Sequence, residues 1–397
     1  MSLRINRPHP IIVPANPTPL PGGAQNSQVL TNINGQNVWT YPQYWIQGKN
    51  FIPSRTVDVS SVQQFELSAT GKYLGASLSN RGFIYCFPDN SNNVMIINPY
   101  TNQVDTTTIS NITNARYPVL QSDAYKFAGG VTYNNNIYSV PQRAKAVMNI
   151  NTLNNTVSFI DVSNFANVTD NWLGAVLSPN GIIYGINHQN TSVLRIDPST
   201  NAVSTINISG LAGSANYYAG GVLAPNGNIY GVPFNATSVL VIDTSNNTAR
   251  ANIAGLTGLT GTEKWLGGVL GPNGRIYCIP FDSPNCLVID TSSNTTSNIA
   301  VPAGNNQWYG GVLGLDGFIY GIPHRSSSVL RINPFNNTAN VTDISGVNAI
   351  NDRWAGGVLA PNGKIYMVMS NSPNVGIIKT DLPTQEPWMT APEYNKI

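Results

Sequence analysis

The feature that most constrains the fold is a segment that recurs seven times along the chain. Its clearest copy is residues 265–277, with the sequence WLGGVLGPNGRIY. Aligned on their tyrosines, successive copies are 53, 46, 46, 47, 43 and 46 residues apart. A period in the forties is typical of propellers and other repeat arrays, in which each repeat folds into one unit. The repeat tyrosines are Tyr85, Tyr138, Tyr184, Tyr230, Tyr277, Tyr320 and Tyr366.

Each repeat predicts four short strands. In the clearest copy these are residues 265–270, 275–279, 287–290 and 296–301. The segments are rich in β-branched residues and bounded by Gly, Pro, Asn and Ser, and a Pro-Asn-Gly turn separates the first two. No helical period is present in the sequence. The chain is therefore predicted to be an all-β protein, a seven-bladed β-propeller with four-stranded blades.

The two ends of the repeat region predict how the ring closes. Residues 56–62 look like a fourth strand without the first three, whereas the last repeat stops after its third strand, residues 376–380. We expect the N-terminal strand to complete the last blade, because a closed ring leaves no free sheet edge. The expected divisions are a Pro-rich extended arm at 1–24, a short β-hairpin-like adaptor at 25–52, the propeller at 53–381 and a C-terminal tail at 382–397.

The Pro-rich arm is a candidate anchor. Its six prolines exclude helix and central strand, so the arm is expected to be extended. The apolar run Ile11, Ile12 and Val13 favours a strap that orders against a partner over a disordered tail. In the adaptor, Asn34-Gly35 is a strong hairpin signal, and Trp39 is a further candidate anchoring residue.

Composition argues against several classes of partner. Charged residues are 10% of the chain, and 20 basic against 18 acidic residues give a net charge of +2, which offers no electrostatic case for nucleic acid. No apolar run approaches the roughly 20 residues of a membrane span, and the N-terminus lacks a secretory apolar region. We therefore expect that the chain does not insert into a membrane. We also expect that it folds in a reducing cytosol. Cys86, Cys278 and Cys286 are expected to be buried free thiols.

The first strand of every copy carries a glycine pair, or Gly-Ala, and an aromatic residue. Crowding explains the glycines, because seven first strands converge on the axis of a propeller. The aromatic residue stands two positions before the first glycine, so the seven rings are expected to form a circle near one mouth of the channel. Four of the residues that precede these aromatics are cationic. The resulting candidate ligand-binding rim consists of Tyr73, Phe127, Trp172, Tyr218, Trp265, Trp308 and Trp354 with Lys72, Lys126, Lys264 and Arg353.

Two interpretations of this aromatic circle stay open. Aromatic rings edged with Lys and Arg can stack on sugar faces and hold acidic or hydroxylated glycans. Alternatively, the aromatics pack between neighbouring first strands and the cations are solvated at the rim, because a feature present in every blade is more often architectural than functional.

Catalytic and metal-binding patterns are scarce. His188 and His324 occupy the same place in their repeats, four residues after the tyrosine, and are expected on surface loops. No Ser-His-Asp set, Gly-rich phosphate loop or Cys-x-x-Cys is evident. The sequence predicts no catalytic residue, no metal site and no cofactor.

The repeat carries a family resemblance over about residues 53–381. GGVLAPNGNIYGVP, residues 220–233, resembles the repeats of seven-bladed propellers in bacterial surface proteins, in the streptogramin-lyase-like group and in structural proteins of phages and large DNA viruses. The lyase-like resemblance implies a metal-assisted His-Glu-His centre; Glu263 lies near the aromatic circle, and no matching histidines accompany it. Residues 21–39, with PGG, QVLT and GQNVW, resemble a segment that recurs in phage tail fibres and in viral spike or decoration proteins.

These observations favour a non-enzymatic structural protein of a virion, as a capsid-associated, spike or tail-fibre component made in the host cytoplasm. The arm is expected to bind other virion proteins, and the outward face of the propeller is a candidate for binding a host surface glycan. The competing hypotheses are a lyase- or lactonase-type enzyme with its site at the channel mouth, and a bacterial surface or scaffold propeller. In the last case the protein would be located at the cell surface.

Overall fold

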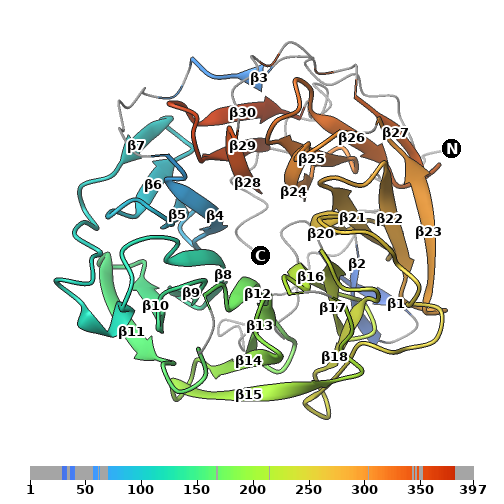
Figure 1. Cartoon of the computed structure of the whole chain (residues 1–397). Coiled ribbons are helices and arrows are strands. Elements are labelled where there is room, and N and C mark those ends of the chain that lie inside the picture. Colours follow the sequence, from blue (N-terminus) through green and yellow to red (C-terminus); the bar gives the residue numbers. More distant parts are fainter. Residues whose placement is uncertain are drawn as a thin grey trace, which may run out of the picture.

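Seven four-stranded blades surround a central axis (Figure 1). The outer strands of two neighbouring blades pair in parallel, at Ile208 with Ala249 and Ser209 with Arg250, and join these blades into one eight-stranded sheet. The computed structural model of the chain describes residues 29–33, 36–40, 57–60, 62, 70–166, 169–213, 215–302, 304–341, 344, 347 and 352–380. The helix in this part, η1 (Pro118–Leu120), is three residues long. The predicted all-β, seven-bladed propeller with four-stranded blades is confirmed. Within the described ranges, no helix has the length and apolar character needed to span a membrane.

The blades are antiparallel sheets, numbered 1 to 7 in the order of their innermost strands. The first strands, at the axis, are β4 (Tyr73–Leu78), β8 (Phe127–Tyr133), β12 (Trp172–Leu177), β16 (Tyr218–Leu223), β20 (Trp265–Leu270), β24 (Trp308–Leu313) and β28 (Trp354–Leu359). The second strands are β5 (Ile84–Pro88), β9 (Asn136–Pro141), β13 (Ile183–Asn187), β17 (Ile229–Pro233), β21 (Ile276–Pro280), β25 (Ile319–Pro323) and β29 (Lys364–Met369). The third strands are β6 (Met95–Asn98), β10 (Ala146–Asn151), β14 (Ser192–Asp197), β18 (Leu240–Asp243), β22 (Asn285–Asp290), β26 (Leu330–Asn333) and β30 (Gly376–Lys379). The outer strands are β7 (Gln103–Asp105), β11 (Thr156–Asp161), β15 (Ala202–Ser209), β19 (Thr248–Arg250), β23 (Thr295–Ala300), β27 (Thr338–Asn340) and, in blade 7, β3 (Val57–Asp58).

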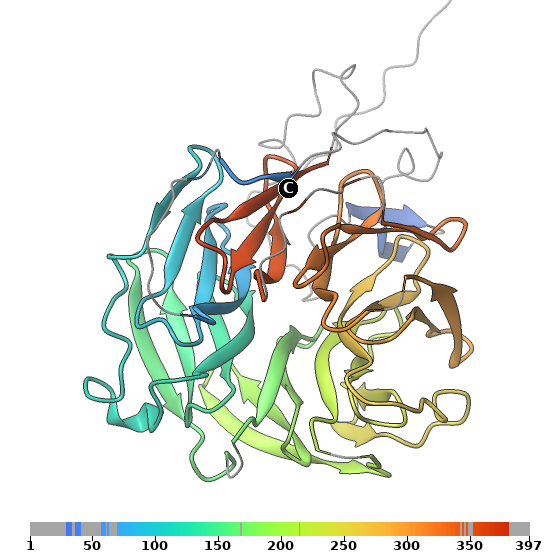
Figure 2. The same ribbon diagram turned by 45° about the horizontal axis from the view of Figure 1, so that its top comes forward.

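Blade 7 is built from both ends of the propeller sequence. Its outer strand β3 pairs antiparallel with β30, with Val57 opposite Ile378. Lys379 Nζ lies 3.4 Å from Asp58 Oδ2 across this pair. Figure 2 shows β3, in blue, along the red strands of blade 7. The predicted closure of the ring by an N-terminal strand is confirmed, although the strand spans two residues instead of the expected 56–62.

A two-stranded hairpin precedes the propeller, as Asn34-Gly35 predicts. Strand β1 (Val29–Ile33) pairs antiparallel with β2 (Gln36–Thr40), with Ile33 opposite Gln36. The predicted anchoring groups lie outside the described residues, and so do the arm and the tail. These groups are Ile11, Ile12, Val13 and the side chain of Trp39.

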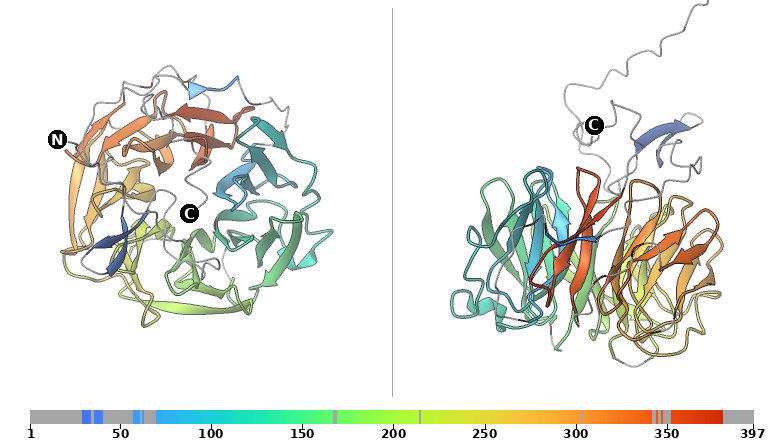
Figure 3. Two further views of the ribbon diagram at one scale, coloured as in Figure 1. Left: turned by 180° about the vertical axis from the view of Figure 1, so that it is seen from behind. Right: turned by 90° about the horizontal axis from the view of Figure 1, so that it is seen from above.

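The strand directions give the ring two unlike faces. First strands run from the aromatic residue to a tight turn, and second strands return antiparallel beside them. The hairpin turns between strands 1 and 2, and between strands 3 and 4, therefore share one face, here called the turn face. The opposite loop face carries the 2–3 loops, which connect strands 2 and 3, and the connections between blades. The side view in Figure 3 shows the ring between these two faces.

The repeat tyrosines lie in the core and tie neighbouring blades together. All seven are at most 3% exposed. In blade 5, the Tyr277 hydroxyl donates to Asn337 Oδ1 at 2.9 Å. Asn337 lies in the 3–4 turn of blade 6 with a φ of +53°, a conformation that asparagine tolerates better than most residues. One contact thus accounts for both the tyrosine and the turn asparagine of the repeat.

Blade 6 shows how this contact changes where the ring closes. β30 and β3 of blade 7 come from distant parts of the chain, so blade 7 has no 3–4 turn that could offer an asparagine to blade 6. Tyr320 instead donates to Asp316 Oδ2 of its own blade at 2.6 Å. Asp316 replaces the asparagine that blade 5 has in its Pro-Asn-Gly turn, Asn273. The substitution gives the tyrosine the acceptor that it would otherwise lack.

Glycines form the narrowest part of the ring, here called the waist. The first glycine of each pair has a φ between +69° and +95°, and each first strand carries a β-bulge at this point. A Cβ on Gly267 would lie 2.8 Å from the Cα of Gly310 in the next blade. The predicted crowding at the axis is confirmed, and the left-handed φ adds a second requirement for glycine.

Candidate functional site

The aromatic circle is buried, so the expectation of an open binding rim is wrong. Its seven rings are at most 5% exposed. The indole Nε1 of Trp265 donates to the carbonyl of Asn285 at 2.7 Å, and Trp308 makes the corresponding bond to Ser328 at 2.8 Å. The rings fill the space between the first strands and the 2–3 loops, which leaves no ring face for a sugar. Packing is therefore the correct interpretation for Tyr73, Phe127, Trp172, Tyr218, Trp265, Trp308 and Trp354.

The cations beside the circle are also buried, which contradicts both interpretations made for them. Lys264 Nζ donates to the carbonyls of Phe234 and Ala236, each at 3.0 Å, in the 2–3 loop of the preceding blade. Lys72 Nζ reaches the same loop of blade 7 at the carbonyl of Ser370, 3.0 Å away. Burial lowers the pKa of Lys264 to about 8. These lysines connect adjacent blades through buried carbonyls.

Two cations depart from this pattern. Lys126 Nζ donates to the carbonyl of Asp123, 2.8 Å away in its own loop. Arg353 is 2% exposed, and neither of its Nη atoms has a hydrogen-bond partner. Its guanidinium carbon lies 5.0 Å from the centre of the Trp354 ring, a cation–π contact that offsets part of its desolvation.

A second ring of side chains closes the loop-face end of the channel. Its members stand four residues after the repeat tyrosines, and in blades 3 to 6 they are His188, Phe234, Phe281 and His324. Tyr309 from β24 joins them, and the centroids of contacting rings lie 5.2 to 6.2 Å apart. We call this cluster the loop-face plug. Its apolar layer comprises Leu74, Ala128, Leu173, Ala219, Leu266 and Ala355.

The two histidines belong to the plug, which corrects the expectation that they lie on surface loops. Each is 8% exposed. His188 Nδ1 lies 2.7 Å from the carbonyl of Tyr218, and His324 Nδ1 lies 2.8 Å from that of Trp354. Burial lowers the pKa of both imidazoles, and at His324 this is opposed by Asp352, whose Oδ1 lies 3.2 Å from His324 Nε2. Among the described residues, no group of three or more His, Cys, Asp or Glu side chains could hold a metal ion.

The plug is polar over blades 1 and 2. Asp89 takes the plug position in blade 1, and its Oδ1 is buried without a hydrogen-bond partner. Burial raises the pKa of Asp89 to about 7, against the opposing effect of Lys126 and Arg143. Burial also lowers the pKa of Lys126 to about 8. The sequence reasoning missed Asp89 as a functional candidate, although a carboxylate at a position held by phenylalanine in blades 4 and 5 was a usable signal.

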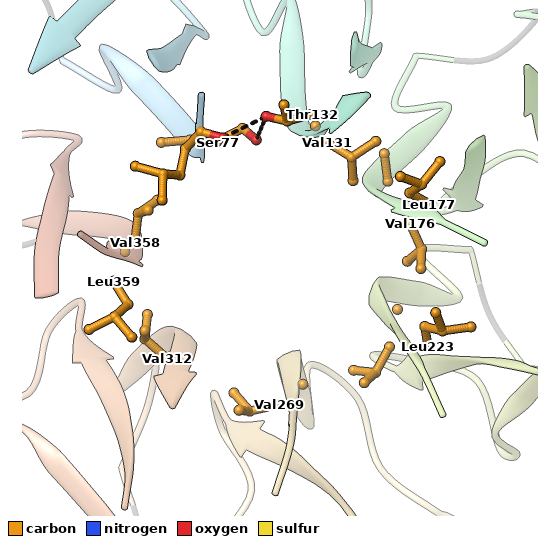
Figure 4. A pocket seen from close by; sticks show the side chains of 18 of the residues that line it. Ser77, Val131, Thr132, Val176, Leu177, Leu223, Val269, Val312, Val358 and Leu359 are labelled. Atoms are coloured by element: carbon orange, nitrogen blue, oxygen red, sulfur yellow. Dashed lines mark hydrogen bonds between the residues drawn. The ribbon is translucent and has the colours of Figure 1, made fainter. Parts of the chain in front are cut away.

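The turn-face end of the channel is an open cavity of about 380 Å³, here called the well (Figure 4). Residues of all seven first strands line it, and valines among them such as Val269 and Val358 are largely buried in the clusters between blades. In blades 1 and 2 the hydroxyl oxygens Ser77 Oγ and Thr132 Oγ1 lie at the wall, 2.8 Å apart. Since the plug fills the other end, the well opens on the turn face. It is lined by residues 76–78, 130–132, 175–177, 221–223, 268–269, 311–313 and 357–359.

The three cysteines are buried free thiols, as expected. Burial raises the pKa of each thiol well above its ordinary value. A thiol in this state is a poor nucleophile, because the thiolate is the reactive form.

Comparisons with known proteins support the fold. The fold and repeats define the chain as a seven-bladed β-propeller repeat protein. Residues 209–391, under half of the chain, match a sequence family described as a repeat of unknown function (DUF6923). No curated protein matches the chain in sequence. The solved structure of a streptogramin B lyase is similar, with a TM-score of 0.64 at 12% identity over 82% of this chain and 97% of that one.

Two further solved structures have the same fold. One is the extracellular domain of a one-component system from B. thetaiotaomicron, with a TM-score of 0.59 at 11% identity over 83% of this chain and 44% of that one. The other is YCF48 bound to D1 peptide, with a TM-score of 0.57 at 14% identity over 85% of this chain and 100% of that one. These likenesses support the propeller resemblance seen in the sequence, whereas the resemblance to phage and viral proteins stays a prediction.

Proposed function

We propose that the chain is a non-enzymatic structural protein of a virion, a capsid-associated, spike or tail-fibre component that displays its loop face outward. The path of the chain carries this proposal. Strand β3 begins and β30 ends at the turn face, because β3 pairs antiparallel with β30 and β30 runs in the direction of β28. The segments before residue 57 and after residue 380 therefore both start at that face. An arm that anchors on other virion proteins would leave the loop face free.

Incorporation into particles tests the anchor. The full chain and a variant that lacks residues 1–50 would be expressed during infection, and mass spectrometry would measure each in purified particles. We expect the truncated chain to keep its β-rich circular dichroism spectrum and to be lost from the particles. Equal incorporation of both chains would contradict the anchoring role of the arm.

A host glycan on the outward face must contact exposed side chains, and we propose Tyr125 for this role. Tyr125 is 41% exposed on the loop face, with the guanidinium carbon of Arg143 4.2 Å from its ring centre. Arg143 is in turn paired with Asp170 at 2.8 Å. A φ of +52°, uncommon for tyrosine, holds the ring in this place. An aromatic ring beside a guanidinium and a carboxylate suits an acidic or hydroxylated sugar.

A matched pair of exposed tyrosines tests the glycan contact. Tyr100 is 55% exposed in the 3–4 turn of blade 1, on the turn face. Binding of the full chain to a broad glycan array should be lost in Tyr125→Ala and kept in Tyr100→Ala. Binding lost only in Tyr100→Ala would reverse the proposed orientation of the propeller.

A propeller enzyme of the lyase or lactonase type is the second candidate function, because Asp89 and Lys126 are two buried titratable groups at the loop-face end of the channel, each of which influences the pKa of the other. Their pKa values of about 7 and about 8 suit proton transfer near neutral pH. Turnover of cyclic esters that disappears in Asp89→Asn and in Lys126→Met, with the fold kept, would favour the enzyme over the structural protein.

A further inference from the structure

We propose that the turn face of the propeller binds another virion protein along four adjacent blades, 6, 7, 1 and 2, and that Tyr100, Leu153 and Phe335 are the anchoring side chains. We call these three side chains the turn-face arc. The inference rests on the proposed function, because it names the surface with which the propeller itself meets the particle. The partner is an extended protein surface that carries apolar and acidic side chains.

The arc occupies one position of the 3–4 turn. Blades 1 to 6 have such a turn, and its third residue is exposed in each. The six turns have the same shape, because the last residue of each is an asparagine with a φ between +53° and +58°. In each turn, the main-chain N–H of the third residue donates to a side-chain oxygen of the first residue at 2.9 to 3.1 Å. The third residues are Tyr100, Leu153, Ser199, Ser245, Ser292 and Phe335.

The turns of blades 3 to 5 differ in chemistry from those of blades 1, 2 and 6. In blades 3 to 5 the turn begins with aspartate and its third residue is serine, as in blade 3, where Ser199 Oγ donates to Asp197 Oδ1 at 2.6 Å. In blades 1, 2 and 6 asparagine replaces the aspartate and a large hydrophobic residue replaces the serine, as in Asn98 and Tyr100. The main-chain bond of the turn is kept in both versions. The turn itself therefore gives no reason for the hydrophobic residues.

The hydrophobic residues lie on one side of the ring. Blades 6 and 1 flank blade 7, and blade 2 follows blade 1 (Figure 1). Leu153 is 58% exposed, Tyr100 55% and Phe335 42%. The other large hydrophobic residues that are exposed in the described part of the chain, Val59 and Tyr125, belong to blades 7 and 2. Exposed apolar residues that occur singly need no explanation, whereas residues that gather on one side of a protein mark an interaction surface.

Tyr100 is held in place before any partner binds. A Cβ on Gly82 would lie 2.6 Å from Tyr100 Oη and 3.2 Å from Pro361 Cγ. The hydroxyl of Tyr100 thus lies against the 1–2 turn of its own blade, close to the 1–2 turn of blade 7. An aromatic side chain that is already positioned loses little freedom on binding, which suits an anchor.

The charges of the two sides indicate the chemistry of the partner. The turns of blades 3 to 5 are acidic, and hydrogen bonds from the turn serines lower the pKa of their aspartates, Asp197, Asp243 and Asp290. The arc has asparagine in place of these aspartates, and the exposed Arg81 lies beside it. Arg81 Nη1 donates to the carbonyl of Thr152, directly before Leu153, at 3.4 Å. An apolar surface with acidic groups fits this side and is repelled by the other.

The extent of the arc excludes a small ligand. Blades 6 and 2 stand on opposite sides of the pair formed by blades 7 and 1, so an occupant that touches Phe335 and Leu153 together must span four blades. Stable protein interfaces, which bury about 800 Å² on each partner, have this extent. The arc also surrounds β3 and β30 of blade 7, where the chain enters and leaves the propeller at the same face.

A triple variant tests the arc. Tyr100→Ser, Leu153→Ser and Phe335→Ser introduce the residue that blades 3 to 5 carry at the same place, so the fold should be kept. The matched control carries Ser199→Ala, Ser245→Ala and Ser292→Ala on the other side of the face. Each full chain would be expressed during infection and measured by mass spectrometry in purified particles. We expect the arc variant to melt within about 2 °C of the native chain and to fall at least about tenfold in particles, and the control to match the native chain.

The outcomes separate the arc from the virion role. Equal incorporation of the native chain and the arc variant would overturn the arc and leave the virion role standing. Absence of the native chain from particles would overturn the virion role, and this inference with it. Sedimentation velocity examines a second copy as the occupant, because a dimer of the native chain that disappears in the arc variant would assign the arc to self-association and overturn the inference.

A charge reversal tests the acidic character of the partner. Arg81→Glu places an anion beside Leu153 and should lower incorporation at least about threefold. The control is Arg250→Glu, at an exposed arginine of β19 in blade 4, which should leave incorporation unchanged. Unchanged incorporation of Arg81→Glu would show that the partner is not acidic and would overturn this part of the inference.

Discussion

The two ends of the central channel are made from the same seven strands and are closed in different ways. Toward the loop face, the strand residues are covered by 2–3 loops, which place side chains such as Phe281 and His324 over the axis. Toward the turn face, the 1–2 connection is a tight turn such as residues 271–274, which is too short to cover the axis. The loop-face end is therefore closed from within the blades, and the turn-face end stays open unless another segment fills it.

The two ends also differ in how much the blades vary. At the well, six of seven blades supply valine and the seventh supplies Ser77. At the plug, the corresponding residues include an aspartate, two histidines, two phenylalanines and a serine. A position that is nearly uniform around the ring serves the fold, whereas a position that changes from blade to blade can distinguish one side of the ring from the other. Chemistry specific to this chain is therefore expected at the plug and not at the well.

Substitution by alanine should lower the free energy of unfolding far more at a buried tryptophan of the closed end than at a valine of the open end. This is the largest difference that we expect between the two ends. Trp308→Ala removes an indole that is 1% exposed, together with its bond to the carbonyl of Ser328, and should lower the free energy of unfolding by about 4 kcal/mol. Val312→Ala removes methyl groups that already face the well and should cost about 1 kcal/mol. Urea denaturation of both variants measures the difference. Comparable losses would mean that the well packs as tightly as the plug.

A glycine-to-alanine substitution should destabilise the protein more at the waist than at the turn face, by a smaller margin than in the previous comparison. Gly267→Ala places a Cβ 2.8 Å from the Cα of Gly310 at a φ of +72°, and should cost about 3 kcal/mol. Gly227 is a matched control, because its φ is +83° and a Cβ there would meet nothing within 4 Å. Gly227→Ala should cost about 1 kcal/mol, from the backbone alone. If the two variants have the same melting temperature, crowding at the waist is not what requires glycine.

Loss of a buried lysine should destabilise the closed end. Lys264→Met removes the ammonium donor from the carbonyls of Phe234, Ala236 and Gly261, of which Phe234 keeps the backbone N–H of residue 264, and should lower the free energy of unfolding by about 2 kcal/mol. The control is Lys364→Met, at the turn-face end of β29, for which we expect a change below about 0.5 kcal/mol. Chemical denaturation would detect this difference. A stabilised Lys264→Met variant would show that desolvation of the ammonium outweighs its three bonds.

The periodic part of the structure could be predicted from the sequence, because it depends on local signals that recur. Repeated turns and glycine pairs located the strands, and the unmatched third strand at residues 376–380 revealed the closure by β3. The direction of the aromatic side chains could not be predicted in this way. A β-bulge lies between Trp265 and Gly268, and it breaks the alternation from which an inward or outward direction is normally inferred. The 2–3 loops that cover the rings carry no repeat of their own.

The buried cations could have been recognised from a pattern that was visible in the sequence. The residue before the aromatic is Lys, Lys, Asn, Tyr, Lys, Gln and Arg in blades 1 to 7. Each of these side chains has a hydrogen-bond donor, and none is a carboxylate. Such a choice is expected where carbonyl groups converge, as around Lys264, and not at a solvated rim, where Asp and Glu would be equally acceptable. The property that these seven residues share is a hydrogen-bond donor and not a positive charge, and the shared donor indicates that they face buried carbonyl groups.

The smallest expected effect concerns Asp89 and depends on pH. Its pKa is about 7 in the folded chain against 3.8 as an ordinary value, so the folded state binds the proton more tightly. Between pH 4 and pH 7 the unfolded chain has already lost this proton, and stability contributed by the protonated carboxyl is lost as the pH rises. Asp89→Asn cannot lose a proton and should be more stable than the native chain at pH 8 by on the order of 1 kcal/mol, with the difference vanishing near pH 4.

Thermal melts from pH 4 to pH 8 would measure this, with Glu263→Gln, an exposed acid on the same face, as the control. A variant that loses stability at pH 8 would mean that the Asp89 carboxylate, through its attraction to Lys126 and Arg143, stabilises the polar side of the plug, and the two ends of the channel would then differ in charge as well as in closure.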